Sequence, residues 1–283
     1  MGSSGRRKKS KKTKSAWGTL IRRLRSVPEV GMRRQLLLEQ LQSMQPGDAL
    51  AFFTEVVAGV ATRQAACLVA LEAIHEAILR GQDQGPVYEL LAEVYRLARE
   101  EKNEGVARLL MITKPQRGPV EPEAIHGDLE LSQLTLGERK FLARGHNRAR
   151  LDRLLLDPEP SVVRNLLRNP HLTEQDVVRL AARRPTRTEI QKVIHASRWG
   201  SRYRVRLALV CNPYTPTDLS LKLVGFLLHK DLRGVRNDGN LHELVREEAK
   251  RLLRKRRKGK QEDYADDSEP LSGSSSSESS SSG

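Results

Sequence analysis

The strongest concentration of side chains that could do chemistry is basic and lies in residues 178–206. This stretch contains nine Arg or Lys residues, and Glu189 is its only acid. Trp199 and Tyr203 stand among the arginines, four residues apart and therefore on one face of a helix. Guanidinium groups and aromatic rings together can stack on bases and hold phosphates. The candidate binding patch comprises Arg179, Arg183, Arg184, Arg187, Arg198, Trp199, Arg202, Tyr203, Arg204 and Arg206.

Three interpretations of this patch remain open: a solvated helix face, a nucleic-acid surface and a surface for an acidic protein. Arginine is a good helix former with a long apolar stem, which favours the solvated face. Trp199 is better interpreted as a wedge between helices than as a platform for a base. A second basic run contains Arg139, Lys140, Arg144, Arg148, Arg150 and Arg153, opposed by Glu138 and Asp152.

Signatures of catalysis and metal binding are missing from the sequence. It contains no phosphate-binding loop, no Gly-x-Gly-x-x-Gly, no Gly-x-Ser-x-Gly and no His-Glu-x-x-His. The seven histidines are scattered, and His75 lies in an apolar helical stretch that favours a structural role. Cys67 and Cys211 are 144 residues apart, and buried free thiols are favoured over a disulfide. We therefore expect no enzyme activity, no catalytic residue, no cofactor, no metal and no small-molecule substrate.

The net charge of +15 is concentrated in the two ends of the chain. Residues 1–25 contain ten bases and no acid, and residues 251–260 contain seven bases and no acid. Residues 261–283 contain six acids, which leaves 33 bases against 29 acids in residues 26–250. Basic ends of this kind resemble targeting signals or nucleic-acid-binding arms. No apolar run approaches the about 18 residues that a membrane span needs, so we expect a soluble, cytoplasmic protein without a membrane partner.

The elements that must position these residues are predicted to be helices. Aromatic residues make up only 4% of the chain, and leucine, valine and alanine recur at helical spacing. Asp48, Thr135, Thr173 and Thr217 are predicted N-caps, and Gly81 is a predicted helix stop. The predicted division is a disordered basic tail (1–15), an N-terminal helical region (16–112), a Pro/Gly linker (113–131), helical repeats (132–256) and a disordered Ser-rich acidic tail (257–283).

A motif recurs within the predicted repeats. Asn169-Pro170 and Asn212-Pro213 are 43 residues apart, and each is followed by a Thr-x-x-Asp sequence. Because proline disfavours helical geometry in the residue before it, each asparagine is a predicted helix terminus. The spacing predicts three-helix units over residues 157–197 and 198–238, with a partial third copy after them.

These residues resemble the HEAT/armadillo class of α-helical repeats and its bacterial leucine-rich-repeat-variant relatives. The resemblance covers residues 135–255 and implies an all-α, elongated solenoid with a concave binding face, preceded by an N-terminal helical bundle. We expect a non-enzymatic scaffold for a protein partner. The alternative is a nucleic-acid-associated protein that uses the candidate patch and the basic tails. A third interpretation is a HEAT-like DNA-modifying enzyme, for which Asp176, Trp199 and Arg202 only nominally supply a pocket.

Overall fold

The computed structural model describes residues 17–80, 86–111, 115–117 and 128–266, which fold into helices α1 to α16 and contain no strand. The all-helical prediction is therefore confirmed for the described part of the chain. No helix among these residues is long and apolar enough to cross a membrane. The predicted basic tail, the helix stop at Gly81 and the Ser-rich end lie outside the described residues.

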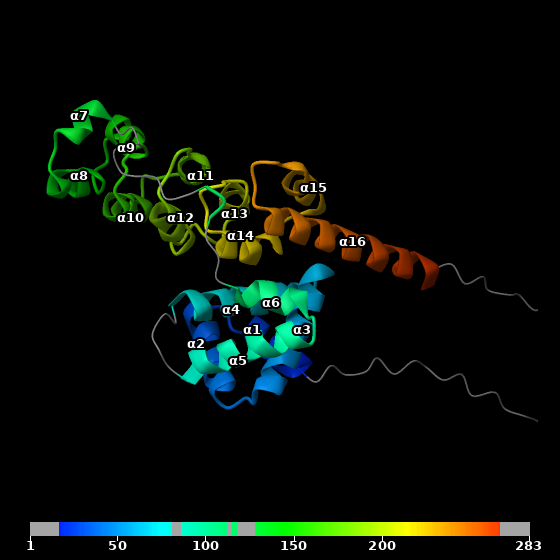
Figure 1. Ribbon diagram of the computed structural model, residues 1–283. Coiled ribbons are helices and arrows are strands. Elements are labelled where there is room, and N and C mark those ends of the chain that lie inside the picture. Colours follow the sequence, from blue (N-terminus) through cyan, green and yellow to red (C-terminus); the bar gives the residue numbers. More distant parts are fainter. Residues whose placement is uncertain (1–16, 81–85, 112–114, 118–127, 267–283) are drawn as a thin grey trace, which may run out of the picture.

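The N-terminal part is a bundle of six helices (Figure 1). They are α1 (Gly18–Ser26), α2 (Val30–Gln42), α3 (Pro46–Ala61), α4 (Ala65–Arg80), α5 (Pro86–Glu100) and α6 (Glu104–Leu110). Phe52, Phe53 and Val56 of α3 are fully buried at the centre. Proline fills the first position of both α3 and α5, where the missing N–H has no intrahelical partner to lose. The predicted cap at Asp48 is wrong, because α3 already begins at Pro46 and Asp48 lies in its first turn.

The C-terminal part contains ten helices. They are α7 (Leu129–Ser132), α8 (Leu136–Leu142), α9 (Arg148–Leu154), α10 (Pro160–Arg168), α11 (Glu174–Ala182), α12 (Thr188–His195), α13 (Tyr203–Val210), α14 (Thr217–Val224), α15 (His229–Asn237) and α16 (Glu243–Asp266). Thr135 forms the predicted capping box with Glu138, and Thr173 is an N-cap as predicted. Thr173 also forms a capping box with Asp176. The prediction for Thr217 is wrong, because it is the first residue of α14 and Pro216 occupies the cap position.

Both predicted boundaries of the repeat region shift. Helix α7 begins at Leu129, inside the predicted linker, because Asp128 accepts hydrogen bonds from the backbone N–H of Glu130 and Leu131. Helix α16 continues to Asp266, so the predicted disorder is wrong for residues 257–266. Lys, Arg, Gln and Glu have high helix propensity, and this stretch follows without interruption from a helix anchored in the core.

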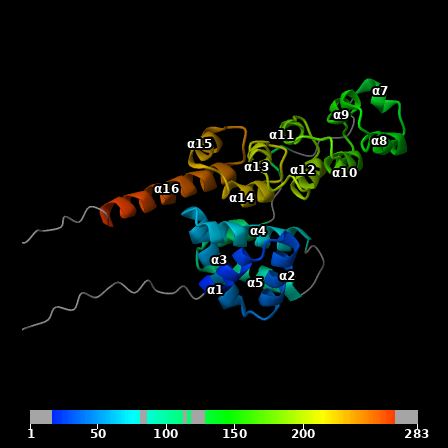
Figure 2. The same ribbon diagram turned by 180° about the vertical axis from the view of Figure 1, so that it is seen from behind.

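Helices α8 to α16 are arranged in two rows (Figures 1 and 2). The even row contains α8, α10, α12, α14 and α16; the odd row contains α9, α11, α13 and α15. Contacts between α8 and α10, α10 and α12, α14 and α16, and α11 and α13 each join a helix to the next member of its row. Each of these contacts therefore spans a unit of two helices.

Side-chain hydrogen bonds show the length of this unit. Arg148 bonds to Asp176 (28 residues apart), Arg179 to Asp152 (27) and Arg204 to Gln175 (29). The predicted three-helix unit of about 43 residues is therefore corrected to a two-helix unit of about 24 to 31 residues. Asn169 follows α10 in the even row, whereas Asn212 follows α13 in the odd row, so 43 residues correspond to three helices.

The two asparagines nevertheless make the same contacts. The Nδ2 of Asn169 donates to the carbonyls of Ala143 and Gly145, and the Nδ2 of Asn212 donates to those of Ala181 and Arg183. The Oδ1 of each accepts the backbone N–H two residues further on. Each asparagine therefore ties the end of its own helix to the end of the previous helix in the same row. Such carbonyls have no intrahelical partner.

The bundle packs against the repeats at α14, which contacts α6, while α16 contacts α3. One hydrophobic cluster runs through both parts, and almost every residue of α14 is buried. Gly225 follows α14 because a Cβ there would lie 2.9 Å from the Cγ1 of Val60 in the bundle. Residue 117 of the predicted linker also contacts the repeats, since the Arg117 N–H donates to the Pro213 carbonyl (3.0 Å).

Candidate binding site

Most residues of the candidate patch have partners within the protein. Arg179 lies 2.6 Å from Asp176 and 2.9 Å from Asp152. Arg187 lies between Glu159 and Glu189, at 3.7 and 3.6 Å. Arg204 donates to the Oε1 of Gln175 (2.7 Å). Arg202 is exposed, and the described residues offer its side chain no hydrogen bond or ion pair.

Three further arginines of the patch donate to carbonyls at helix ends. Arg183 reaches the carbonyls of Leu155 and Asp157 beyond α9. Arg184 bonds to the carbonyl of Cys211 at the end of α13, and Arg198 to that of Asn169 at the end of α10 (3.1 Å). Because the last carbonyls of a helix lack intrahelical partners, these bonds join successive helix pairs. The contacts are consistent with structural roles for these side chains.

The two aromatic residues of the patch also make internal contacts. The Nε1 of Trp199 donates to the Leu167 carbonyl (2.9 Å), and its ring lies beneath the guanidinium of Arg198. The Tyr203 hydroxyl donates to Asp231 and accepts the Leu228 N–H (3.0 Å). Burial, followed by the contact with Asp231, raises the pKa of Tyr203 to about 12. Both side chains therefore lie between successive helices of the repeats.

Arg206 points away from the patch, towards the bundle. Its Nη2 lies 2.6 Å from the Oε1 of Glu72 in α4, whose Oε2 accepts a hydrogen bond from Arg33 of α2 (3.1 Å). The guanidinium also stacks on Phe226, 4.0 Å from the ring centroid. Burial lowers the pKa of Arg206, and Glu72 acts against this shift. Because 134 residues separate Arg206 from Glu72, local sequence gives no sign of this pair.

Three arginines of the odd row, Arg148, Arg153 and Arg179, pair with aspartates. Asp176 accepts hydrogen bonds from Arg148 (2.6 and 2.7 Å), from Arg179 and from its capping partner Thr173. These contacts, above all the one with Arg148, hold the pKa of Asp176 well below its usual range. Arg153 pairs in the same way with Asp128, and lowers the pKa of that carboxyl to about 2.

The even row carries cations without such partners. They are Lys140, Arg144, Arg164, Arg168 and Lys192, hereafter the even-row cations. Lys140 is half-buried and the other four are exposed. Within the described parts of the chain, none of the five side chains has a hydrogen bond or an ion pair. The candidate patch did not include them. The signal that could have found them is the pair Arg164 and Arg168, one turn apart beside the buried pairs Val162–Val163 and Leu166–Leu167.

Two histidines are buried where the bundle meets the repeats. The rings of His75 in α4 and His195 in α12 lie 6.5 Å apart, and His75 also contacts Phe226. The Nε2 of His75 and both ring nitrogens of His195 are buried without a hydrogen-bond partner among the described residues. Burial lowers the pKa of His195 to about 3, and Arg206 and Lys222 act in the same direction. Burial, followed by His195, lowers the pKa of His75 well below its ordinary value.

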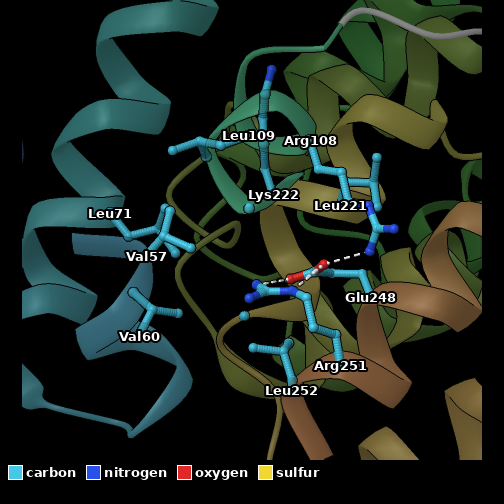
Figure 3. A pocket seen from close by; sticks show the side chains of 12 residues that line it. Val57, Val60, Leu71, Arg108, Leu109, Leu221, Lys222, Glu248, Arg251 and Leu252 are labelled. Atoms are coloured by element: carbon cyan, nitrogen blue, oxygen red, sulfur yellow. Dashed lines mark hydrogen bonds and ion pairs between the residues drawn. The ribbon is translucent and has the colours of Figure 1, made fainter. Parts of the chain in front are cut away.

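A small cavity lies beside this contact, between α3, α4 and α6 of the bundle and α14 and α16 of the repeats (Figure 3). Its volume is about 30 Å³, which suits one or two water molecules rather than a metabolite. Glu248 lies between two arginines, accepting a hydrogen bond from Arg108 (2.9 Å) and one from Arg251 (2.8 Å). A structural ion-pair network therefore borders the cavity.

Metal and thiol chemistry find no support in the described part of the chain. No group of three or more His, Cys, Asp or Glu side chains there could hold a metal ion. Cys67 and Cys211 are free thiols, as favoured from the sequence, and Cys67 is buried while Cys211 is half-buried. Burial raises the pKa of both thiols, with a smaller contribution from Glu55 at Cys67 and from Asp238 at Cys211.

Comparisons of the chain with protein-family models, with curated proteins and with solved structures find no match.

Proposed function

We propose that residues 129–266 form a short α-solenoid of two-helix repeats, and that the protein is a non-enzymatic scaffold for a protein partner. The observation that carries the proposal is the set of even-row cations, which face solvent without internal partners. Arg148, Arg153 and Arg179, by contrast, are paired with aspartates about one helix pair away. The asparagine contacts at both Asn169 and Asn212 support a stack of fixed geometry.

Nucleic-acid binding is the second candidate, and the same unpaired cations favour it. A protein partner is preferred because Trp199 and Tyr203, the aromatic residues that would stack on bases, have their polar atoms bonded inside the repeats. Exposed apolar side chains also occur on the first helix of the even row. Leu136 is 39% exposed and Phe141 is 75% exposed. Apolar contacts of this kind suit the core of a protein interface.

The test is affinity purification of the full chain from its native cells, in an extract treated with nuclease. We expect a protein that co-elutes with it at fixed stoichiometry in size-exclusion chromatography. Recovery of nucleic acid alone from an untreated extract, with no protein after nuclease, would contradict the proposal. Turnover of a small molecule by the purified chain would contradict the non-enzymatic part of it.

A further inference from the structure

We propose that the even-row cations form the docking surface for an acidic α-helical segment of a protein partner. The inference rests on the proposed scaffold function and adds to it the face that binds and the chemistry of the bound segment. Four observations lead to it: the register of the cations, their lack of internal partners, the way in which the bundle uses the same face, and an apolar neighbour.

The first observation is that the cations are in register along the row. Arg164 lies between the buried pairs Val162–Val163 and Leu166–Leu167 of α10. Lys192 lies in the same way between Ile190–Gln191 and Ile194–His195 of α12. Lys140 of α8 has the corresponding place, three residues before the buried Ala143. The three side chains therefore occupy one position in three neighbouring helices of the even row, α8, α10 and α12, and are separated by 24 and 28 residues.

Two further cations follow the aligned positions of Lys140 and Arg164. Arg168 follows Arg164 by four residues in α10, and residues four apart share a helix face. Arg144 follows Lys140 by four residues, in the turn after the end of α8. The corresponding position after Lys192 is Ala196, which is exposed. Glu189 is the exposed acid of α12, and Arg187 is its ion-pair partner (3.6 Å). The face therefore carries an excess of positive charge across α8, α10 and α12.

The second observation is that the even-row cations lack acidic partners. In the odd row, Arg148, Arg153 and Arg179 each lie within 3 Å of an aspartate. Arg150 and Arg233 of the odd row are exposed without such partners, but they lie outside the aligned positions of the even row. The even-row cations have no such acid among the described residues, so their charge is directed to solvent and is free to meet an anionic partner.

The third observation is that the same face already binds helices elsewhere in the row. The positions in α14 that correspond to Lys192 and Ala196, each 29 residues later, are Leu221 and Gly225. Both line the contact with the bundle, where a Cβ on Gly225 would meet Val60 and Leu71. Figures 1 and 2 show α8 and α10 extending past the bundle. A bound helix would therefore continue the packing of the bundle along the even row, with ion pairs in place of apolar contacts.

The fourth observation selects an acidic protein segment over nucleic acid. Leu136 lies one turn before Lys140 on the same face and is 39% exposed, so an apolar contact stands beside the cations. Packed helices are about 8–10 Å apart. Glutamates seven residues apart on an α-helix are separated by about 10.5 Å. An acidic helix lying across the row can therefore place one carboxylate near each of Lys140, Arg164 and Lys192.

The test measures binding of two fluorescent peptides to the full chain by fluorescence anisotropy over a salt series. Both are helix-forming peptides of about 21 residues, three heptads, with the same composition. One has glutamates at seven-residue spacing on a single face next to leucines, and the other has the same residues distributed around the helix. We expect tighter binding of the first peptide, weakening as salt screens the charges.

Two triple variants locate the binding surface. The test variant is Lys140→Glu, Arg164→Glu and Lys192→Glu. The matched control is Arg150→Glu, Arg202→Glu and Arg233→Glu, exposed cations outside the even row whose side chains have no hydrogen bond or ion pair to described residues. Exposed ion pairs each contribute little to binding, so three charge reversals together are expected to weaken peptide binding about tenfold. The control, which has the same net charge, is expected to change it less than about twofold.

Three outcomes would overturn the docking proposal. They are equal loss of binding in both variants, equal affinity for the two peptides, and tighter binding of a single-stranded or duplex oligonucleotide that the test variant alone abolishes. The scaffold function fails separately. If the partner recovered from native extract binds the test variant as well as the parent, the docking surface is wrong and the scaffold function stands. If no protein partner is recovered at all, the scaffold function itself fails.

Discussion

Acidification from pH 7.5 to pH 5.0 should weaken the fold through the buried His75–His195 pair. Protonating either ring would place a charge in an apolar site that already contains Arg206 and Lys222, with buried ring nitrogens that have no acceptor among the described residues. With its pKa lowered to about 3, His195 is therefore neutral in the folded protein over this range, and the pKa of His75 is shifted in the same direction. In the unfolded chain a histidine titrates near its ordinary pKa of about 6.5.

The sign and size of the effect follow from the difference in proton binding. The folded pKa of His195 is lowered to about 3, so the unfolded state binds more protons than the folded state between pH 6.5 and pH 3. The free energy of unfolding therefore decreases as the pH is lowered through this range. For that shift the loss at pH 5.0 is about 2 kcal/mol from His195 alone. His75, whose pKa is also lowered, adds to the loss in the same direction. Above about pH 7 the contribution is fully present.

Urea unfolding followed by far-UV circular dichroism at both pH values, at constant ionic strength, measures this loss. The variant His195→Leu should reduce the difference in unfolding free energy between the two pH values by about 2 kcal/mol. The exposed histidine variant His146→Leu is the control and should leave the difference unchanged. An unaltered pH dependence in His195→Leu would refute the assignment of the proton uptake to this pair.

Three further predictions concern the contacts that hold the repeats together. Asn169→Ala leaves two helix-end carbonyls and one N–H without their partner and should lower the unfolding free energy by about 2 kcal/mol in urea titrations; loss no greater than that of Asn165→Ala, whose side-chain bond is 3.5 Å long, would count against it. Gly225→Ala places a Cβ 2.9 Å from Val60 and should cost about 1–3 kcal/mol by the same assay, whereas Gly234→Ala, with open space around it, should not. Asp176→Asn removes the charge that pairs with Arg148 and should cost about 3 kcal/mol at pH 7. Because the pKa of Asp176 is lowered in the fold, the difference from the parent should shrink as the pH falls below about 4, and a difference undiminished at pH 2 would contradict this.

The sequence located some helix ends, at Thr135, Thr173 and Asn169, but it did not give the repeating unit. Asn169 and Asn212 were expected to mark equivalent places in two successive three-helix units. They do make equivalent contacts, but in different rows. An asparagine that bonds to the end of the preceding helix in its row can follow any helix. The distance between two of them therefore gives no count of the helices in one unit.

The sequence also found the basic residues without finding which of them are unpaired. Arg204 and Arg179 belong to the candidate patch but bond to Gln175 and Asp152 one helix pair away. Arg164 stood outside the patch and has no ion pair among the described residues. Whether an arginine is neutralised depends on the side chain that stacking brings next to it, and a local count of charges contains no such information.

What the sequence by itself determined is therefore local. Helical spacing of leucine and valine, the capping pairs Thr135–Glu138 and Thr173–Asp176, and the helix end at Asn169 all depend on residues within one or two turns of each other. Only the tertiary structure decided that Arg206 pairs with Glu72 and that His75 meets His195. It also decided that Arg164 has no ion pair among the described residues. These depend on how helices separated by one repeat or by more than a hundred residues pack, because electrostatic and burial energies are set by neighbours in space rather than along the chain.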